Sequence, residues 1–259
     1  MKRLLVLLFW SSGALFAQSP FDGTWIINSD TAQLPEKPEV YVLSKGMFRC
    51  LTCVPKIEIK ADGHDQNVTG SSYFDTESVR VVDAYTVEFI AKKAGQTMFT
   101  ELDTISPDGD TLTQTLKDTT EAQLVTIVTI SQRVALQRPA GFHALSGSWR
   151  AHKINRSKNG STIKYKCTSD GFSAETPLGE KFDAKFDGNY YPVEDDPGHT
   201  MVSVKLLNPN AVEVTSQRNG KVVGILHMSV APGGESIHVN FENKEGNTTT
   251  TYEMEKQPE

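Results

Sequence analysis

Three cysteines are the first residues in this chain whose type and spacing suggest chemistry. Cys50 and Cys53 form a C-x-x-C spacing, which supports redox chemistry at a helix N-terminus because the helix dipole lowers a thiol pKa. Here Pro55 and an alternating strand pattern follow, and a zinc site would need a second pair of ligands nearby. We therefore expect a structural disulfide between Cys50 and Cys53. Cys167 lies in an alternating run, so we expect it to be buried as a small core residue.

The six histidines do not cluster in the sequence. His227 lies between Leu226 and Met228, in a run with apolar residues on both faces, so it is a candidate for lining a cavity. The alternative is an ordinary core or surface histidine.

The acidic loop 194–199 matches no known calcium-loop spacing, and we expect a solvated turn there. Because no nucleophile elbow or distinct carboxylate pair stands out, the sequence predicts no enzyme, no metal site and no cofactor.

The first seventeen residues have the pattern of a secretory signal peptide. Lys2 and Arg3 precede an apolar run that ends at Trp10, which is short for a membrane span. Cleavage after Ala17 is the main expectation, with Ala14 as an alternative site and a retained anchor as the other interpretation. The sequence thus predicts a secreted or periplasmic protein that does not span the membrane.

The charge of the chain restricts its partners. The formal net charge is −6, and it becomes −8 when the two cations Lys2 and Arg3 are removed. An acidic surface without a basic stripe argues against binding of nucleic acid. The sequence contains no indication of the oligomeric state.

The chain contains an internal repeat. Segment 62–112 aligns with segment 187–237 without a gap, at a constant offset of 125 residues. Each copy also opens with a Gly-x-Trp motif, at Trp25 and Trp149. We expect a signal peptide at 1–17, a first repeat at 18–137, a linker at 138–146 and a second repeat at 147–259.

Each copy has alternating apolar and polar runs separated by Gly, Pro and Asn turns. This pattern predicts eight to ten short strands per copy, and the short connections make sequential strands antiparallel. Closure into a barrel removes exposed sheet edges, so we favour a barrel over a sandwich. The predicted fold class is therefore all-β, with two tandem antiparallel up-and-down β-barrels.

The Gly-x-Trp motif at the start of an antiparallel meander resembles the lipocalin and calycin group. In that group the Trp closes one barrel end and packs under a basic side chain from a late strand. The resemblance implies this structural role for Trp25 and Trp149. It also implies a cation–π contact with Arg133 in the first copy and Lys256 in the second.

A closer resemblance is to uncharacterised exported bacterial proteins with a tandem lipocalin-like repeat. The similar segments are Lys185 to Val193, Asp196 to Gly198, Thr200 to Glu213 and Asn219 to Gly224. The resemblance covers nearly all of the chain after the signal peptide. It implies a lipocalin-like barrel fold and an exported protein, and it brings no established activity.

Barrels of this size either enclose a small ligand or are filled by their own side chains. Tyr190 and Tyr191 lie at a strand end and are candidates for gating such a cavity, together with His227 in its wall. We therefore expect a non-enzymatic protein that binds a small apolar ligand. The alternative is a structural or protein-interaction module of the cell envelope with filled barrels.

Overall fold

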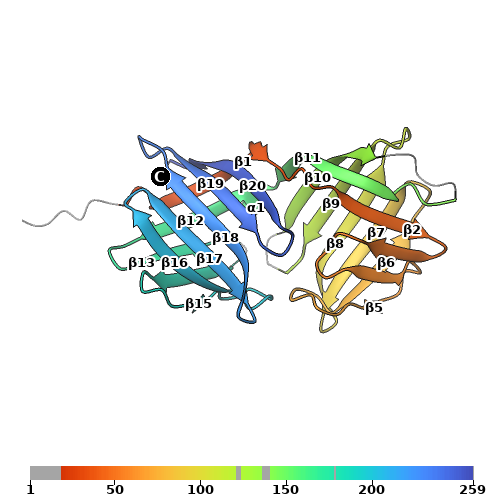
Figure 1. Ribbon diagram of the computed structural model, residues 1–259, viewed down its shortest axis with the longest axis horizontal. Helices are drawn as coiled ribbons and strands as arrows, with labels where there is room; N and C mark the ends of the chain where they lie inside the picture. Colours follow the sequence, from red (N-terminus) through yellow and green to blue (C-terminus); the bar gives the residue numbers. More distant parts are fainter. Residues whose placement is uncertain (1–18, 121–123, 136–140, 178, 259) are drawn as a thin grey trace, which may run out of the picture.

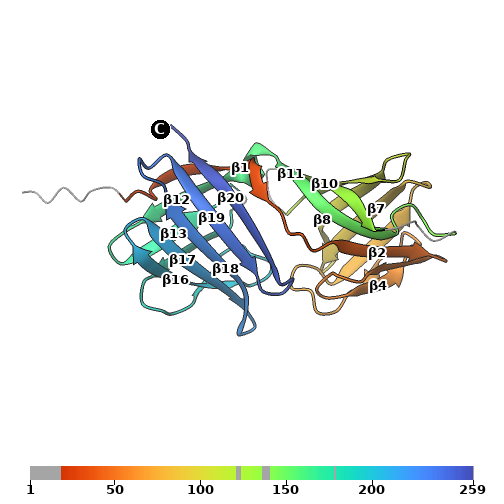
Figure 2. The same ribbon diagram turned by 45° about the horizontal axis from the view of Figure 1, so that its top comes forward.

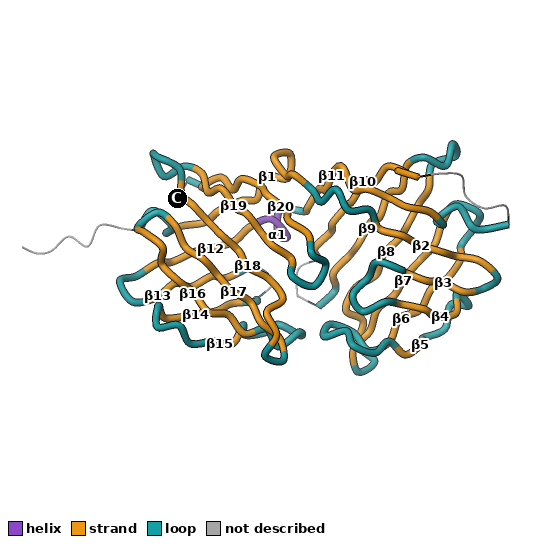
Figure 3. Tube along the Cα trace, viewed as in Figure 1, coloured by secondary structure: helices purple, strands orange, loops and turns teal. Residues whose placement is uncertain are grey.

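The computed structural model describes residues 19–120, 124–135, 141–177 and 179–258. This part of the chain folds into two antiparallel sheets of ten strands each, which lie side by side as two nearly closed barrels (Figures 1 and 3). The one helix in it is the short α1 (Lys158–Ser161). The predicted all-β class with two tandem barrels is confirmed. The predicted signal peptide lies outside the described residues.

One sheet, which we call the N barrel, is formed by ten strands that are consecutive in the chain. They are β2 (Glu39–Ser44), β3 (Met47–Cys50), β4 (Ile57–Lys60), β5 (Gln66–Asn67), β6 (Thr76–Val81), β7 (Thr86–Lys93), β8 (Gln96–Ile105), β9 (Thr111–Asp118), β10 (Val125–Ala135) and β11 (Gly147–Arg156). Their order across the sheet is β4-β3-β2-β11-β10-β9-β8-β7-β6-β5. Short turns between consecutive strands account for most of these antiparallel pairings.

The other sheet, the C barrel, contains nine consecutive strands and one from the start of the chain. They are β12 (Thr162–Cys167), β13 (Gly171–Glu175), β14 (Lys181–Lys185), β15 (Tyr191–Pro192), β16 (Met201–Asn208), β17 (Ala211–Arg218), β18 (Lys221–Val230), β19 (Ser236–Asn243), β20 (Thr248–Lys256) and the early strand β1 (Gly23–Gln33). Their order is β14-β13-β12-β1-β20-β19-β18-β17-β16-β15.

Each barrel closes at its seam by a single bridge between short strands or loops. In the N barrel an isolated antiparallel bridge joins Asp62 to Arg80, and in the C barrel another joins Lys181 to Glu194. The second bridge has both backbone hydrogen bonds, with N to O distances of 2.8 and 3.3 Å. Since these bridges cover the ends of the sheet, little strand edge is left unpaired.

The first strand of each repeat lies in the barrel of the other repeat. β1 pairs with β12 and β20, and β11 pairs with β10 and β2. Figure 2 shows β1 running from the C barrel toward β2, and β11 lying across the N barrel. The repeat limits 18–137 and 147–259 remain predictions for the sequence, but the sheets do not follow them. The predicted linker also contributes Ala144 and Leu145 to the core of the N barrel.

The two tryptophans occupy equivalent places in the two barrels. Trp25 and Trp149 are buried, and each indole N–H donates to the carbonyl oxygen four residues earlier at 2.8 Å, on Phe21 and Leu145 respectively. This contact fixes the ring and satisfies a polar atom that burial would otherwise leave unpaired.

Each tryptophan contacts the basic residue that the sequence analysis assigns to the other tryptophan. The guanidinium carbon of Arg133 lies 4.0 Å from the centre of the Trp149 ring, and the ammonium of Lys256 lies 5.4 Å from that of Trp25. A pairing of Trp25 with Arg133 within the first copy is therefore not found. The reason is the strand exchange, which moves each tryptophan next to the late strand of the other repeat.

The repeat register seen in the sequence is also the register of the folded strands. β7, β8 and β9 have the same lengths as β17, β18 and β19, and each begins 125 residues earlier. The interface between the barrels shows the same symmetry. Lys93 of β7 donates to the carbonyl of Pro197 in the C barrel, and its counterpart Arg218 of β17 donates to the hydroxyl of Tyr73 in the N barrel.

The exchange predicts a specific energetic coupling. In a double-mutant cycle with Arg133→Met and Trp149→Leu, we expect a coupling of about 1–2 kcal/mol, because the stacked guanidinium and indole are lost together. Equilibrium unfolding in denaturant measures it. The cycle of Arg133→Met with Trp25→Leu is the control and should give a coupling near zero. A larger coupling for Arg133 with Trp25 than with Trp149 would contradict the crossed arrangement.

Candidate functional site

The C barrel encloses an open cavity of about 430 Å³ with largely apolar walls. Side chains that alternate along the strands point into it, as expected for the inner face of a barrel. The walls include Ile163, Val202, Val214, Leu226, Met228 and Phe241. The barrel is therefore not completely filled by its own side chains, and this volume is typical of a site for a small organic ligand.

Polar residues from both barrels surround the entrance of this C cavity. Tyr73 of the N barrel lies there with Asp196, Arg218 and Glu245. The Arg218 guanidinium stacks 4.6 Å from the centre of the Tyr73 ring, and it contacts the Glu245 carboxylate at 3.3 Å. Arg218 also donates to the hydroxyl of Thr200 at 3.0 Å. These contacts hold the entrance of the C cavity against the N barrel.

The three ligand-binding residues predicted from the sequence lie apart from this entrance. Tyr191 packs against the core, and its hydroxyl donates to Asp187 at 2.7 Å. Tyr190 is half-buried in the turn before it. His227 faces outward from β18, with its ring nitrogens 3.5 Å from Glu213 and from Glu242. Its neighbours Leu226 and Met228 are among the residues of β18 that line the cavity.

The N barrel encloses a second cavity, of about 580 Å³, with a different interior. Aromatic rings form part of its wall, including Tyr41, Phe89, Phe99 and Trp149. Carboxylates from β2, β6 and β8 also line it, namely Glu39, Glu77, Glu101 and Asp103. The cavity also reaches the β19–β20 turn of the C barrel, so that Asn243 and Glu245 line both cavities.

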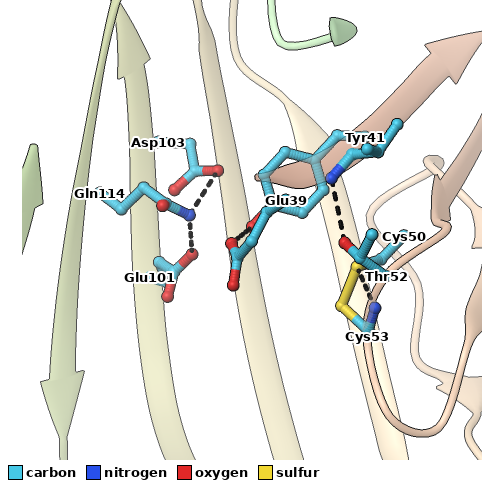
Figure 4. The surroundings of a disulfide bond; sticks show 9 residues. Glu39, Tyr41, Cys50, Thr52, Cys53, Glu101, Asp103 and Gln114 are labelled. Atoms are coloured by element: carbon cyan, nitrogen blue, oxygen red, sulfur yellow. Dashed lines mark hydrogen bonds between the residues drawn. A yellow bond between two sulfur atoms is a disulfide. The ribbon is translucent and has the colours of Figure 1, made fainter. Parts of the chain in front are cut away.

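Two carboxylates of the N cavity are buried and incompletely paired. Glu77 and Asp103 are 5% and 1% exposed. Gln114 donates to Glu101 at 3.1 Å and to Asp103 at 3.4 Å (Figure 4). Glu77 Oε2 and Asp103 Oδ1 have no hydrogen-bond partner. Such atoms are unusual in folded proteins, because an unpaired buried acceptor loses its hydration without compensation.

The environment shifts the pKa values of these groups upward. Burial, with a smaller effect from the charge of Glu101, raises the pKa of Glu77 from its ordinary value of 4.5 to about 7. Burial likewise raises the pKa of Glu101. Burial followed by the charge of Glu101 raises the pKa of Asp103 well above its usual range. Like charges in a poorly solvated cavity oppose the ionisation of one another, so these carboxyl groups retain their protons to higher pH than usual.

Glu39 and Tyr41 of β2 also line the N cavity. The hydroxyl of Tyr41 donates to a carboxylate oxygen of Glu39, and Figure 4 shows both side chains facing Glu101, Asp103 and Gln114. Burial, and then the charge of Glu39, raises the pKa of Tyr41 well above its ordinary value. Tyr41 is therefore a neutral hydrogen-bond donor, and any negative charge in this part of the cavity comes from the carboxylates.

The repeat shows how the two interiors differ. At the offset of 125 residues, Glu77, Glu101 and Asp103 of the N barrel correspond to aliphatic residues in the C barrel. Their counterparts are Val202, Leu226 and Met228, and all three line the C cavity. The same backbone positions therefore carry carboxylates in one barrel and apolar side chains in the other.

Sequence reasoning did not identify the buried acids, because their local pattern indicates the opposite orientation. In β8 the acids Glu101 and Asp103 flank Leu102, which alternation alone would place inside, yet Leu102 is 43% exposed. Comparison of the two repeats gives the correct orientation. Leu226 and Met228, the apolar counterparts of Glu101 and Asp103, must point inward, so Glu101 and Asp103 point inward as well.

The predicted disulfide between Cys50 and Cys53 is present, at the rim of the N cavity. The bond lies beside Tyr41 and Thr52, whose hydroxyl accepts a hydrogen bond from the backbone of Val40 at 3.0 Å (Figure 4). Cys167 is a free, partly buried thiol, and burial raises its pKa. A raised thiol pKa disfavours the reactive thiolate.

Two further features bear on the class of protein. Within the described residues, His, Cys, Asp and Glu side chains form no group of three that could hold a metal ion. The described part of the chain also has no helix with the length and apolar character needed to cross a membrane.

Comparison with known proteins identifies no family. No protein-family model matches the chain, and no curated protein matches it. Among solved structures, a double mutant of the vaccine antigen transferrin binding protein B from Haemophilus parasuis aligns with a TM-score of 0.20 and 10% sequence identity. The alignment covers 79% of this chain and 42% of that chain. Because the TM-score is so low, this likeness carries no argument about function.

The buried Glu77 makes stability depend on pH. Its folded-state pKa is raised, so the folded protein binds the proton more tightly, and stability falls as the pH rises from about 4.5 to about 7. Glu77→Gln removes the ionisable group but keeps its shape. We expect the variant to exceed the parent by about 3 kcal/mol in unfolding free energy at about pH 8, and by little at about pH 4.5.

Denaturant unfolding at several pH values measures this difference. Glu58→Gln is the matched control, because Glu58 lies on the outer face of the same barrel in a surface ion pair with Arg49. Its effect should stay below about 1 kcal/mol across the range. A difference between Glu77→Gln and the parent that does not change with pH would contradict the raised pKa.

Proposed function

We propose that this protein is an exported, non-enzymatic tandem barrel that binds a small apolar ligand in its C barrel. The observation that supports this is the open cavity of about 430 Å³ whose walls are largely apolar. Burial of an apolar ligand there removes hydrocarbon surface from water, which stabilises the complex in proportion to the buried area. The entrance residues Tyr73, Arg218 and Glu245 supply the polar rim that such sites have.

Export is supported by two features of the chain. Lys2 and Arg3, followed by a short apolar run, have the signal-peptide pattern, and Cys50 and Cys53 form a disulfide. Disulfides persist in oxidising compartments and are rare in a reducing cytosol. The lipocalin-like resemblance of the repeats agrees with an exported barrel, and we propose membership of that structural group on the Gly-x-Trp strands.

The proposed export predicts the mass of the protein isolated from its own host. We expect the mature chain to begin at Gln18, because the signal peptide is removed after Ala17. Intact mass spectrometry should also show two hydrogens fewer than the reduced sequence, and reduction should restore them. A chain that retains Met1, or that carries free thiols at Cys50 and Cys53, would contradict this part of the proposal.

Ligand binding in the C cavity is tested with an environment-sensitive fluorescent fatty-acid analogue. We expect saturable binding to the full chain at one molecule per C barrel. Val214→Phe introduces the residue found at the equivalent position of the N barrel, Phe89, and occupies the cavity with apolar bulk. It should weaken binding by about tenfold or more, which corresponds to about 1.4 kcal/mol.

The matched control is Ser229→Val, on the exposed outer face of β18, which adds apolar surface outside the cavity. It should leave binding unchanged. A melting curve of each variant verifies that it is folded. Native mass spectrometry of protein from its own host provides the second measurement. If the parent binds no apolar molecule in either experiment, the function is that of a structural or protein-interaction module.

A further inference from the structure

The N cavity has an acidic interior that the proposed function does not use. Glu77, Glu101 and Asp103 point into it from β6 and β8, where the C barrel has aliphatic residues. We propose that the N barrel binds an organic cation, a protonated amine on an apolar body, with its ammonium paired with carboxylates of this acidic interior. This second site does not depend on the ligand proposed for the C barrel.

Two buried oxygen atoms in the cavity lack donors. Glu77 Oε2 and Asp103 Oδ1 have no partner, although their residues are 5% and 1% exposed. A protonated amine has N–H groups that donate to such atoms, and hydrogen bonds between two charged groups are stronger than those between neutral ones. The ammonium of the ligand therefore provides the hydrogen-bond donors that these two oxygens lack.

The charge of the residues that line the cavity favours a ligand of positive charge. Among the described residues that line it, the acids are Glu39, Glu77, Glu101, Asp103 and Glu245, and Lys37 is the single basic residue. The Lys37 ammonium donates to the carbonyl of Gly246 at the mouth, 2.8 Å away. An anionic ligand would add to the repulsion among buried carboxylates, whereas a cation reduces it.

The size and the walls of the cavity indicate an organic cation rather than a metal ion. The described acids do not converge in a group that could hold a metal, and the cavity has a volume of about 580 Å³. The rings of Tyr41, Phe89, Phe99 and Trp149 line the same space. Aromatic walls bury an apolar body and also attract a cation placed over a ring face.

The adjacent barrel shows that the carboxylates are not needed to build the fold. Val202, Leu226 and Met228 occupy the same positions on the same strands, and that barrel closes in the same way. Burial of Glu77 and Asp103 therefore costs stability without contributing to closure of the barrel. Such a cost is typical of residues that serve a ligand.

Isothermal titration calorimetry of the full chain at about pH 8, where Glu77 is ionised, tests the proposal. The ligands are three amines, hexylamine, phenethylamine and tryptamine, each with the alcohol that replaces its ammonium by a hydroxyl. We expect at least one amine to bind at one molecule per chain, about tenfold or more tightly than its alcohol. The proposal is overturned if every alcohol binds as well as its amine, or if no amine binds at about 1 mM.

Variants locate the site. Glu77→Gln combined with Asp103→Asn replaces two carboxyl groups by neutral amides of the same shape, so it should weaken amine binding about tenfold or more and leave the alcohol unchanged. Glu58→Gln, on the outer face of the same barrel, is the matched control and should bind the amine like the parent. Equal amine affinity in all three proteins would overturn the assignment.

A second variant keeps the test decisive if loss of hydrogen bonds affects folding. Glu101→Leu with Asp103→Met introduces the residues that the C barrel carries at these positions, and its melting temperature verifies that it is folded. It should lose the preference for the amine over the alcohol. Val214→Phe in the C barrel should leave amine binding unchanged. If it abolished amine binding instead, the amine would occupy the C cavity and the proposal for the N barrel would fail.

Discussion

Pairing of β1 with β12 and β20, and of β11 with β2 and β10, determines the geometry of the whole molecule. Each barrel closes around a tryptophan that comes from the other repeat. The chain therefore passes between the two barrels twice, through residues 34–38 and 157–161, and this double connection joins them. This connection holds their entrances against one another, which explains why Asn243 and Glu245 belong to both cavities.

The two barrels show how one scaffold carries two different interiors. The conserved part is the backbone: strand lengths, turns, the Trp contacts and the seams that close the sheets. The variable part is the inner layer, where Glu101 and Asp103 replace Leu226 and Met228. An apolar layer favours the empty or lipid-filled state of a cavity, whereas an acidic layer is costly until a partner of opposite charge restores the lost solvation.

Much of the fold could be predicted from the sequence because it depends on local patterns. Alternating runs, Asn-Gly and Pro-Gly turns and the repeated Gly-x-Trp motif indicate antiparallel barrels, and the C-x-x-C in a strand-rich context indicates the disulfide. The strand exchange could not be predicted in this way. β1 and β11 share the Gly-x-Trp motif, and this motif does not indicate which of the two sheets each strand joins.

The acidic interior of the N barrel could not be predicted from local sequence for another reason. A strand that alternates between acid and leucine indicates a leucine that points inward, and only the counterpart strand β18 reveals that Leu102 corresponds to the outward His227. The prediction of Tyr190 and Tyr191 rests on their position at a strand end, and that of His227 on its place between the apolar residues Leu226 and Met228. The entrance of the C cavity instead uses Tyr73, from the other barrel, and local sequence does not encode such a contact between distant segments.

The place of β1 in the C barrel also has a consequence for biosynthesis. The strands of the N barrel are consecutive, so its sheet is complete as soon as residue 156 has been synthesised. β1 is made before any of them, yet residue 25 pairs with residue 256 near the end of β20. During synthesis this first strand has no partner until β12 has been made, and its second partner is the last strand, β20. Contacts of such long sequence separation form slowly. The N barrel is therefore the part of the chain that can fold first, and the C barrel depends on both ends of the described chain.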